Sequence, residues 1–438
     1  MEFYPLTTKI RAYWENISTS YWFIPACLML LSVVLCSLCL ALVQRASIPA
    51  WLLAFFPIVT QSGAQQLLAT LATSIITATS IAFSMTLVAL VMASSQFGPR
   101  LLRTFMLDKG TQVVLGVLVS TFLFCLISLH HLSSITQNED ALSIISGLSA
   151  LLTILDVFCI IYFIHHLAKF IQADEIIYRC FSDFLGDIDS LLPRPEDQVD
   201  ERPLAEELAV RTSFSITLFS ECCNYVQTIN YRELVNRNPD LITGVEVFVR
   251  SGDYVVEGDP LITVYGRCEI SKEIVAKYRK CLVFGRQRTP VQDPEFAISQ
   301  LVEIALRALS PGINDPYTAI TCLDRLTSAC VIMHDREFPA NCVVNTATDI
   351  WLLRRTFALA SVINTAFDQI RQAGESHMAI NLHLMHCYTK LKSHLDTQYH
   401  PLLQKHAKAT TYLASQKTFS DKEQNELEEA NKRFVEPT

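Results

Sequence analysis

Hydrophobic residues are concentrated in the first third of the chain, where they form long apolar stretches. No Asp, Glu, Lys or Arg occurs between Arg45 and Arg100. Apolar runs of about 20 residues are long enough to cross a bilayer as a helix. The pattern predicts transmembrane helices at residues 21–43, 65–92, 111–131 and 141–168. Residues 46–60 are apolar but short and interrupted by proline, so we interpret them as an interfacial or re-entrant segment.

A stripe of polar side chains follows the second predicted span. Its members recur at steps of three and four residues, which places them on one face of a helix. They are Gln66, Thr70, Thr73, Thr77, Ser80 and Ser84. Two interpretations stay open: close helix packing with the hydroxyls bonded to their own backbone, or the lining of a hydrated path.

Asp156 lies near the middle of the fourth predicted span. A carboxylate at that depth in a bilayer is costly and marks a functional or inter-helix site. We expect its partners to be hydroxyl groups of the second span.

The segment that follows the second span is a candidate link between the membrane helices and the soluble part. Pro99 bends the chain as it leaves the bilayer, and two arginines three residues apart point the same way on a short helix. Contact of these arginines with lipid phosphates is the alternative. The candidate coupling residues are Ser95, Gln96, Phe97, Pro99, Arg100 and Arg103.

Basic residues are distributed unequally around the spans. They gather before the first span, between the second and third, and after the fourth: Lys9, Arg11, Arg100, Arg103, Lys109, Lys169 and Arg179. Because Lys and Arg are enriched on the cytoplasmic side of membrane proteins, residues 1–20 and the C-terminus are predicted to be cytoplasmic.

The remaining two thirds of the chain alternate between strand and helix patterns. Residues 170–203 predict a helix and a proline-rich linker. Residues 204–266 have strand alternation and glycine turns, which predict a small β-barrel-like module. Residues 267–396 predict a helical domain with long helices at 349–374 and 376–396, and residues 397–438 predict peripheral charged helices.

The expected fold class therefore has two parts. A polytopic α-helical membrane domain with four transmembrane helices is joined to a cytoplasmic α+β domain, which contains the small β-barrel-like module and a helical bundle.

Two polar groups in the helical region are candidates for a cytoplasmic ligand site or interface. The first group is Arg286, Arg288, Gln292 and Asp293, and the second is Ser310, Gly312, Asn314 and Asp315. A buried Arg–Asp pair would explain the first group structurally, whereas an anion held by its two arginines is the alternative. The second group forms a break between helices, with Asp315 as N-cap before a proline, and suits a capped turn or a ligand or subunit contact.

These motifs resemble a known family. Gly285-Arg-x-Arg-Thr-x-x-Gln-Asp293, Arg307-Ala-Leu-Ser-Pro-Gly-Ile-Asn-Asp-Pro316 and Ser94-Ser-Gln-Phe-Gly-Pro-Arg100 are similar to signatures of the DUF2254 family of bacterial membrane proteins. The resemblance covers roughly residues 20–395. It implies a multi-pass protein of the bacterial inner membrane and implies no particular biochemical function.

Composition and motif content exclude several classes of function. The net charge of −8 argues against a nucleic-acid partner. The 14 cysteines are dispersed without paired metal-ligand spacing, so no metal or cofactor is expected, and such thiols suit a reducing cytoplasm. The chain has no nucleophile elbow, zinc-protease motif or phosphate-binding glycine loop, so we do not expect an enzyme.

Two functions remain. The first is an ion channel or transporter-like conductance with a cytoplasmic regulatory domain. Because four helices hardly enclose a pore, this function requires a homo-oligomer in the lipid bilayer. The alternative is a membrane-anchored sensor or scaffold, whose soluble part binds an unknown cytoplasmic ligand or partner.

Overall fold

A computed structural model describes residues 21–45, 58–98, 108–135, 139–192, 214–237, 240–345 and 347–436. The chain divides into two compact units, Met1–Glu175 and Ile176–Thr438, and each has its own core.

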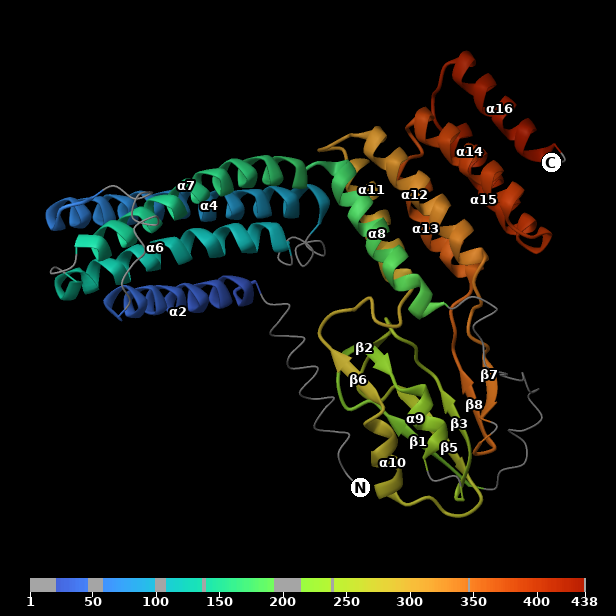
Figure 1. The fold of residues 1–438 in the computed structure, drawn as a ribbon. Coiled ribbons are helices and arrows are strands. Elements are labelled where there is room, and N and C mark those ends of the chain that lie inside the picture. Colours follow the sequence, from blue (N-terminus) through green and yellow to red (C-terminus); the bar gives the residue numbers. More distant parts are fainter. Residues whose placement is uncertain are drawn as a thin grey trace. The chain divides into compact units, whose positions relative to one another are not determined.

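In the described residues, the first unit contains four long helices, which lie side by side (Figure 1). They are α2 (Phe23–Arg45), α4 (Gln61–Phe97), α6 (Lys109–Ile135) and α7 (Glu139–Phe170). All four are long and apolar enough to cross a membrane, as the sequence predicts. Most of the predicted interfacial segment at 46–60 lies outside the described residues.

Helix α6 is central to the packing of this unit because it contacts α2, α4 and α7. The side of α4 that packs inward has many small residues, including Ala64 and Ala72, which allow neighbouring helices to approach closely. A hydrogen bond also joins α2 to α6, because Ser32 Oγ of α2 donates to the carbonyl oxygen of Ser120 in α6 over 2.7 Å.

The second unit contains two open β-sheets. A five-stranded sheet has the order β1-β5-β3-β8-β7, and a three-stranded sheet has the order β4-β2-β6. The strands are β1 (Phe214–Phe219), β2 (Asn224–Ile229), β3 (Ile242–Val247), β4 (Tyr254–Val255), β5 (Pro260–Gly266), β6 (Leu282–Gly285), β7 (Cys342–Asn345) and β8 (Ile350–Arg354). All pairings are antiparallel except β3 with β8.

The prediction of a small β-barrel-like module is wrong, because neither sheet closes on itself in the described residues. Both sheets instead share one hydrophobic core with two short helices, α9 (Tyr231–Asn236) and α10 (Lys272–Arg279). Side chains such as Val226 of the smaller sheet and Ile262 of the larger sheet are fully buried in this core.

Strands β6, β7 and β8 lie beyond residue 266, and β8 occupies residues that were predicted to begin a long helix at 349. Ile350-Trp-Leu-Leu is an apolar run that helix and strand periodicity do not distinguish. Pairing with β3 makes this run a strand, and in that pairing Trp351 lies opposite Gly244. A Cβ atom at Gly244 would overlap the indole ring, so the glycine leaves room for the tryptophan.

The remainder of the second unit is helical (Figure 1). Helices α11 and α12 pack together, α11 also contacts α13, and α14 contacts α12, α15 and α16. The helices are α8 (Ala173–Leu191), α11 (Glu295–Ala308), α12 (Pro316–His334), α13 (Leu359–Ala373), α14 (Met378–His394), α15 (His400–Ser415) and α16 (Asp421–Val435). Ser420 and Glu423 form a capping box that starts α16.

Candidate functional site

The polar stripe of α4 faces away from the other helices of the first unit. The buried face of α4 includes Leu68, Ile75 and Ala82, whereas all members of the stripe are exposed. The exposed residues are Gln66, Thr70, Thr73, Thr77, Ser80 and Ser84.

The hydroxyl groups of this stripe bond back to their own helix. Thr77 Oγ1 donates to the carbonyl oxygen of Thr73, and Ser80 Oγ donates to that of Ile76, each over 2.8 Å. Thr70 and Thr73 make the same type of bond. The hydroxyl protons of these four residues are therefore donated within the helix, while their oxygen lone pairs can still accept a hydrogen bond.

A groove of about 520 Å³ lies over one half of the same face. Thr77, Ser80 and Ser84 line it together with apolar side chains of α4, and Leu167 and Ile171 close it at the end of α7. Part of the polar stripe thus borders an open groove on the surface of the first unit.

Asp156 is inside the first unit, with an exposed fraction of 2%. Its Oδ1 atom accepts a hydrogen bond from Thr121 Oγ1 of α6 over 3.1 Å. The expectation of a partner on the second span is therefore wrong, because α7 turns this carboxyl group toward α6. Asp156 Oδ2 is buried, and the described residues give it no hydrogen-bond partner. This acid belongs to the α6–α7 contact and not to the exposed face of α4.

The candidate coupling segment is described only in part. Ser95, Gln96 and Phe97 form the last turn of α4, and Phe97 is buried. Pro99, Arg100 and Arg103 lie outside the described residues.

After this gap, Asp108 starts α6 and links it to α7. Its Oδ2 atom accepts a hydrogen bond from the amide of Thr111 over 2.9 Å and lies 2.8 Å from Nε2 of His166. Burial by itself would raise the pKa of Asp108, but the bonds from Thr111 and His166 hold that pKa below its ordinary value. The pair fixes the start of α6 against the end of α7.

In the second unit, Arg288 and Asp293 form an ion pair. Arg288 Nη2 and Nε lie 2.6 Å and 3.1 Å from Asp293 Oδ2. The Asp293 side chain has no exposed surface, and burial raises the pKa of this carboxyl above its usual value although the Arg288 guanidinium acts in the opposite direction. The structure therefore contains the buried Arg–Asp pair, which was one of the two predicted alternatives.

The turn between β3 and β4 packs directly on this pair. Gly252 has a φ of 92°, and a Cβ atom there would overlap Asp293 Oδ2. Its amide donates to the carbonyl oxygen of Val226 over 2.9 Å, which ties the turn to β2. Only glycine satisfies both the backbone conformation and the close approach.

The other two members of the first group have different surroundings. The Gln292 side-chain amide binds the backbone of Ile229, accepting from its N–H over 2.9 Å and donating to its carbonyl oxygen over 3.1 Å. Gln292 therefore fixes the loop before α11 to the end of β2. Arg286 is exposed on the surface.

The second polar group lies at the opposite end of α11. Asn314 has a φ of 51°, the amide of Asp315 donates to the carbonyl oxygen of Ala308, and Asp315 Oδ1 accepts from the amide of Thr318. Ser310 Oγ donates to the carbonyl oxygen of Arg307, and Gly312 is exposed. These bonds make a capped turn.

The two polar groups do not form a single site. Helix α11 has 14 residues, so its axis separates them by about 21 Å. A ligand small enough to be held by Arg288 could not reach Asn314.

A pocket of about 200 Å³ in the second unit is lined by basic residues that sequence analysis did not single out. Arg354, the last residue of β8, and Arg355, which follows it, line the pocket with Tyr231, Ser251 and Gln292. The Arg354 guanidinium lies 4.9 Å from the centre of the Tyr231 ring, and Arg355 Nη1 lies 3.1 Å from Asp253 Oδ2. The two adjacent arginines could have indicated this pocket in the sequence. Because residues 349–374 were predicted to form a helix, no sheet residues were expected beside them.

Comparison with known proteins gives a family match. The family model described as "Predicted membrane protein (DUF2254)" matches residues 18–390. Uncharacterized proteins of Mycobacterium bovis and Mycobacterium tuberculosis are 31% identical to the chain over 325 residues, which is 72% of this chain. The chain spans 61% of the length of these relatives. No solved structure matches the chain with significance.

Proposed function

The chain belongs to the DUF2254 family of predicted membrane proteins, and from this premise we propose that it is an oligomeric ion conductance of the channel or transporter type. The second unit would be its cytoplasmic regulatory domain. The distribution of Lys and Arg supports an arrangement with both termini in the cytoplasm, and the bacterial inner membrane is the proposed location.

The exposed polar face of α4 is the observation that carries this proposal. Against lipid, the free lone pairs of Thr77, Ser80 and their neighbours have no hydrogen-bonding partner. The same face of a second copy, or water held between copies, would supply one. Several copies that turn α4 toward a common axis would surround a path lined by hydroxyl groups. Asp156 would lie outside this path, because its carboxyl group points into the α6–α7 contact.

We predict that Thr77→Leu combined with Ser80→Leu lowers ion flux through reconstituted proteoliposomes by at least about tenfold. Removal of two hydroxyl groups and addition of bulk would dewet and narrow the path. Thr79→Val is the matched control, because Thr79 is on the buried face of the same helix and its hydroxyl bonds to Ile75. If the double variant carried the same flux as wild type, the stripe would not line the ion path and would serve only helix packing.

A second candidate function is the membrane-anchored sensor, and the pocket beside Arg354 and Arg355 favours it. Two guanidinium groups close to Ser251 and Gln292 suit a small anionic ligand. In this case wild-type protein would carry no flux of cations, anions or protons, and its four helices would act as an anchor.

We predict that inorganic phosphate raises the unfolding temperature of the purified full chain and that Arg355→Ala abolishes this increase. Arg286→Ala is the matched control, since it removes one exposed arginine that does not line the pocket. An equal increase in both variants would mean that phosphate acts through general charge screening, and the pocket would not be a ligand site.

A further inference from the structure

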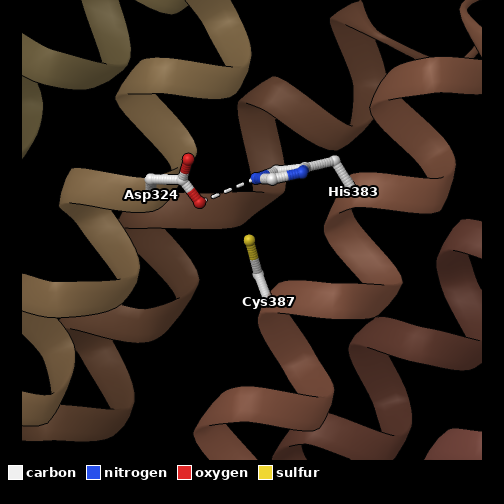
Figure 2. A group of neighbouring side chains, drawn as sticks. All are labelled: Asp324, His383 and Cys387. Carbon is white, nitrogen blue, oxygen red and sulfur yellow. Dashed lines mark hydrogen bonds and ion pairs between the residues drawn. The ribbon is translucent and has the colours of Figure 1, made fainter.

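Three side chains with metal-binding atoms meet between two helices of the second unit. Asp324 projects from α12, while His383 and Cys387 project from α14 (Figure 2). The two helices pack against each other, and residues four apart on α14 lie on one face. One turn of α14 therefore presents an imidazole and a thiol to the same point on α12.

The ligand atoms are already close together. His383 Nε2 lies 2.9 Å from Asp324 Oδ1, and the nitrogen, oxygen and sulfur atoms all lie within 4.8 Å of one another. Figure 2 shows the Cys387 sulfur directed toward the bond between the other two side chains. In a tetrahedral zinc site the ligand atoms are about 3.3–3.6 Å apart, so small side-chain rotations would bring all three onto one ion.

Exposure changes across the group in a way that suits entry of an ion from solvent. Cys387 is 1% exposed, the His383 side chain is 20% exposed and the Asp324 side chain is 51% exposed. The sulfur thus lies deepest in the group, and the carboxylate lies at its solvent-accessible side. Three protein ligands at an open rim leave a fourth position for water.

A simple Asp–His ion pair accounts for only two members of the group. The buried sulfur of Cys387, which also interacts with the Thr327 hydroxyl, completes a set of one thiol, one imidazole and one carboxylate. This mixed donor set matches the preference of Zn²⁺ and of the spectroscopic substitute Co²⁺. Among the residues that the structure describes, no other set of three His, Cys, Asp or Glu side chains meets the same distance condition.

We propose that Asp324, His383 and Cys387 form a binding site for a divalent transition metal of the zinc type, which joins α12 to α14. The proposal is independent of the conductance and of the anion pocket, and it changes the expectation that the chain has no metal site. Burial raises the pKa of the Cys387 thiol to about 12, so the sulfur carries a proton before the ion arrives. Binding forms the metal–sulfur bond and releases this proton to solvent.

Titration of the full chain in detergent with Co²⁺, under conditions that keep thiols reduced, tests the site. We expect one equivalent of Co²⁺ to give a thiolate-to-cobalt charge-transfer band and tetrahedral absorption, and Zn²⁺ to displace it. Cys387→Ser should remove the charge-transfer band. Asp324→Asn changes an exposed side chain and should not impair folding, yet should weaken binding by more than the roughly 10–100-fold that loss of an outer-shell partner costs.

Two controls separate this site from adventitious binding by other residues. Cys268→Ser removes an exposed thiol, and His394→Ala removes an exposed imidazole at the end of α14. Both variants should keep the wild-type spectrum and affinity. A charge-transfer band that persists in Cys387→Ser, or an affinity unchanged in Asp324→Asn, would overturn the proposal, as would the absence of any band in the wild-type protein.

Discussion

Replacement of Arg288 by alanine is expected to lower the free energy of unfolding of the second unit by about 3 kcal/mol or more. The change leaves the carboxyl group of Asp293 buried without its guanidinium partner. The loss of a charged partner from a buried pair costs much more than the pair itself contributes. The effect can be measured by urea unfolding of the full chain in detergent, followed by the fluorescence of Trp351.

Trp351 is the only tryptophan of residues 176–438, and it becomes the only reporter in a background with Phe at Trp14, Trp22 and Trp51. Arg286→Ala is the control and should change the free energy by less than about 0.5 kcal/mol, because Arg286 is exposed two residues away. The double variant Arg288→Ala/Asp293→Leu should recover much of the loss, since no unpaired buried charge remains. A double variant less stable than Arg288→Ala would contradict this explanation.

Replacement of Gly252 by alanine is expected to destabilise the same unit by about 2–4 kcal/mol. Part of this cost is backbone strain at a positive φ, and part is the overlap of the new Cβ atom with Asp293. Gly258 separates the two contributions, because its φ is 93° but no heavy atom lies within 4 Å of an added Cβ. Gly258→Ala should therefore cost only the strain, about 1–2 kcal/mol.

The excess cost at Gly252 should decrease when Asp293 is first replaced by alanine, because the overlapping atom is then absent. The same unfolding assay on the four variants of a double-mutant cycle measures this coupling. Equal costs at Gly252 and Gly258, with no coupling to Asp293, would show that the turn does not rest on the ion pair.

The transmembrane helices could be predicted because membrane crossing depends on a local property. Runs such as residues 65–92 contain no charged side chain, and their backbone must bond internally in lipid. The periodicity of Thr73, Thr77 and Ser80 likewise placed these residues on one face of a helix. It gave no information about which neighbours the face meets, so the partner of Asp156 was assigned to the wrong span.

The sheets were predicted less well because their pairing is not local. Residues 350–354 form a strand only because β3, far earlier in the chain, offers an edge with Gly244 opposite Trp351. The same limit applies to the candidate sites. Arg288 and Asp293 were found because they are five residues apart, whereas Asp324 and His383 come from helices separated by two strands and a third helix.

The parallel pairing of β8 with β3 also has a consequence for synthesis of the chain. Strands β1, β5 and β3 leave the ribosome well before their neighbour, which follows about a hundred residues later. Until then the edge of β3 presents unpaired amide and carbonyl groups that could pair with another nascent chain. The β7–β8 hairpin later pairs with this edge, so we expect the newly made chain to be most prone to aggregation in the interval before the hairpin is synthesised.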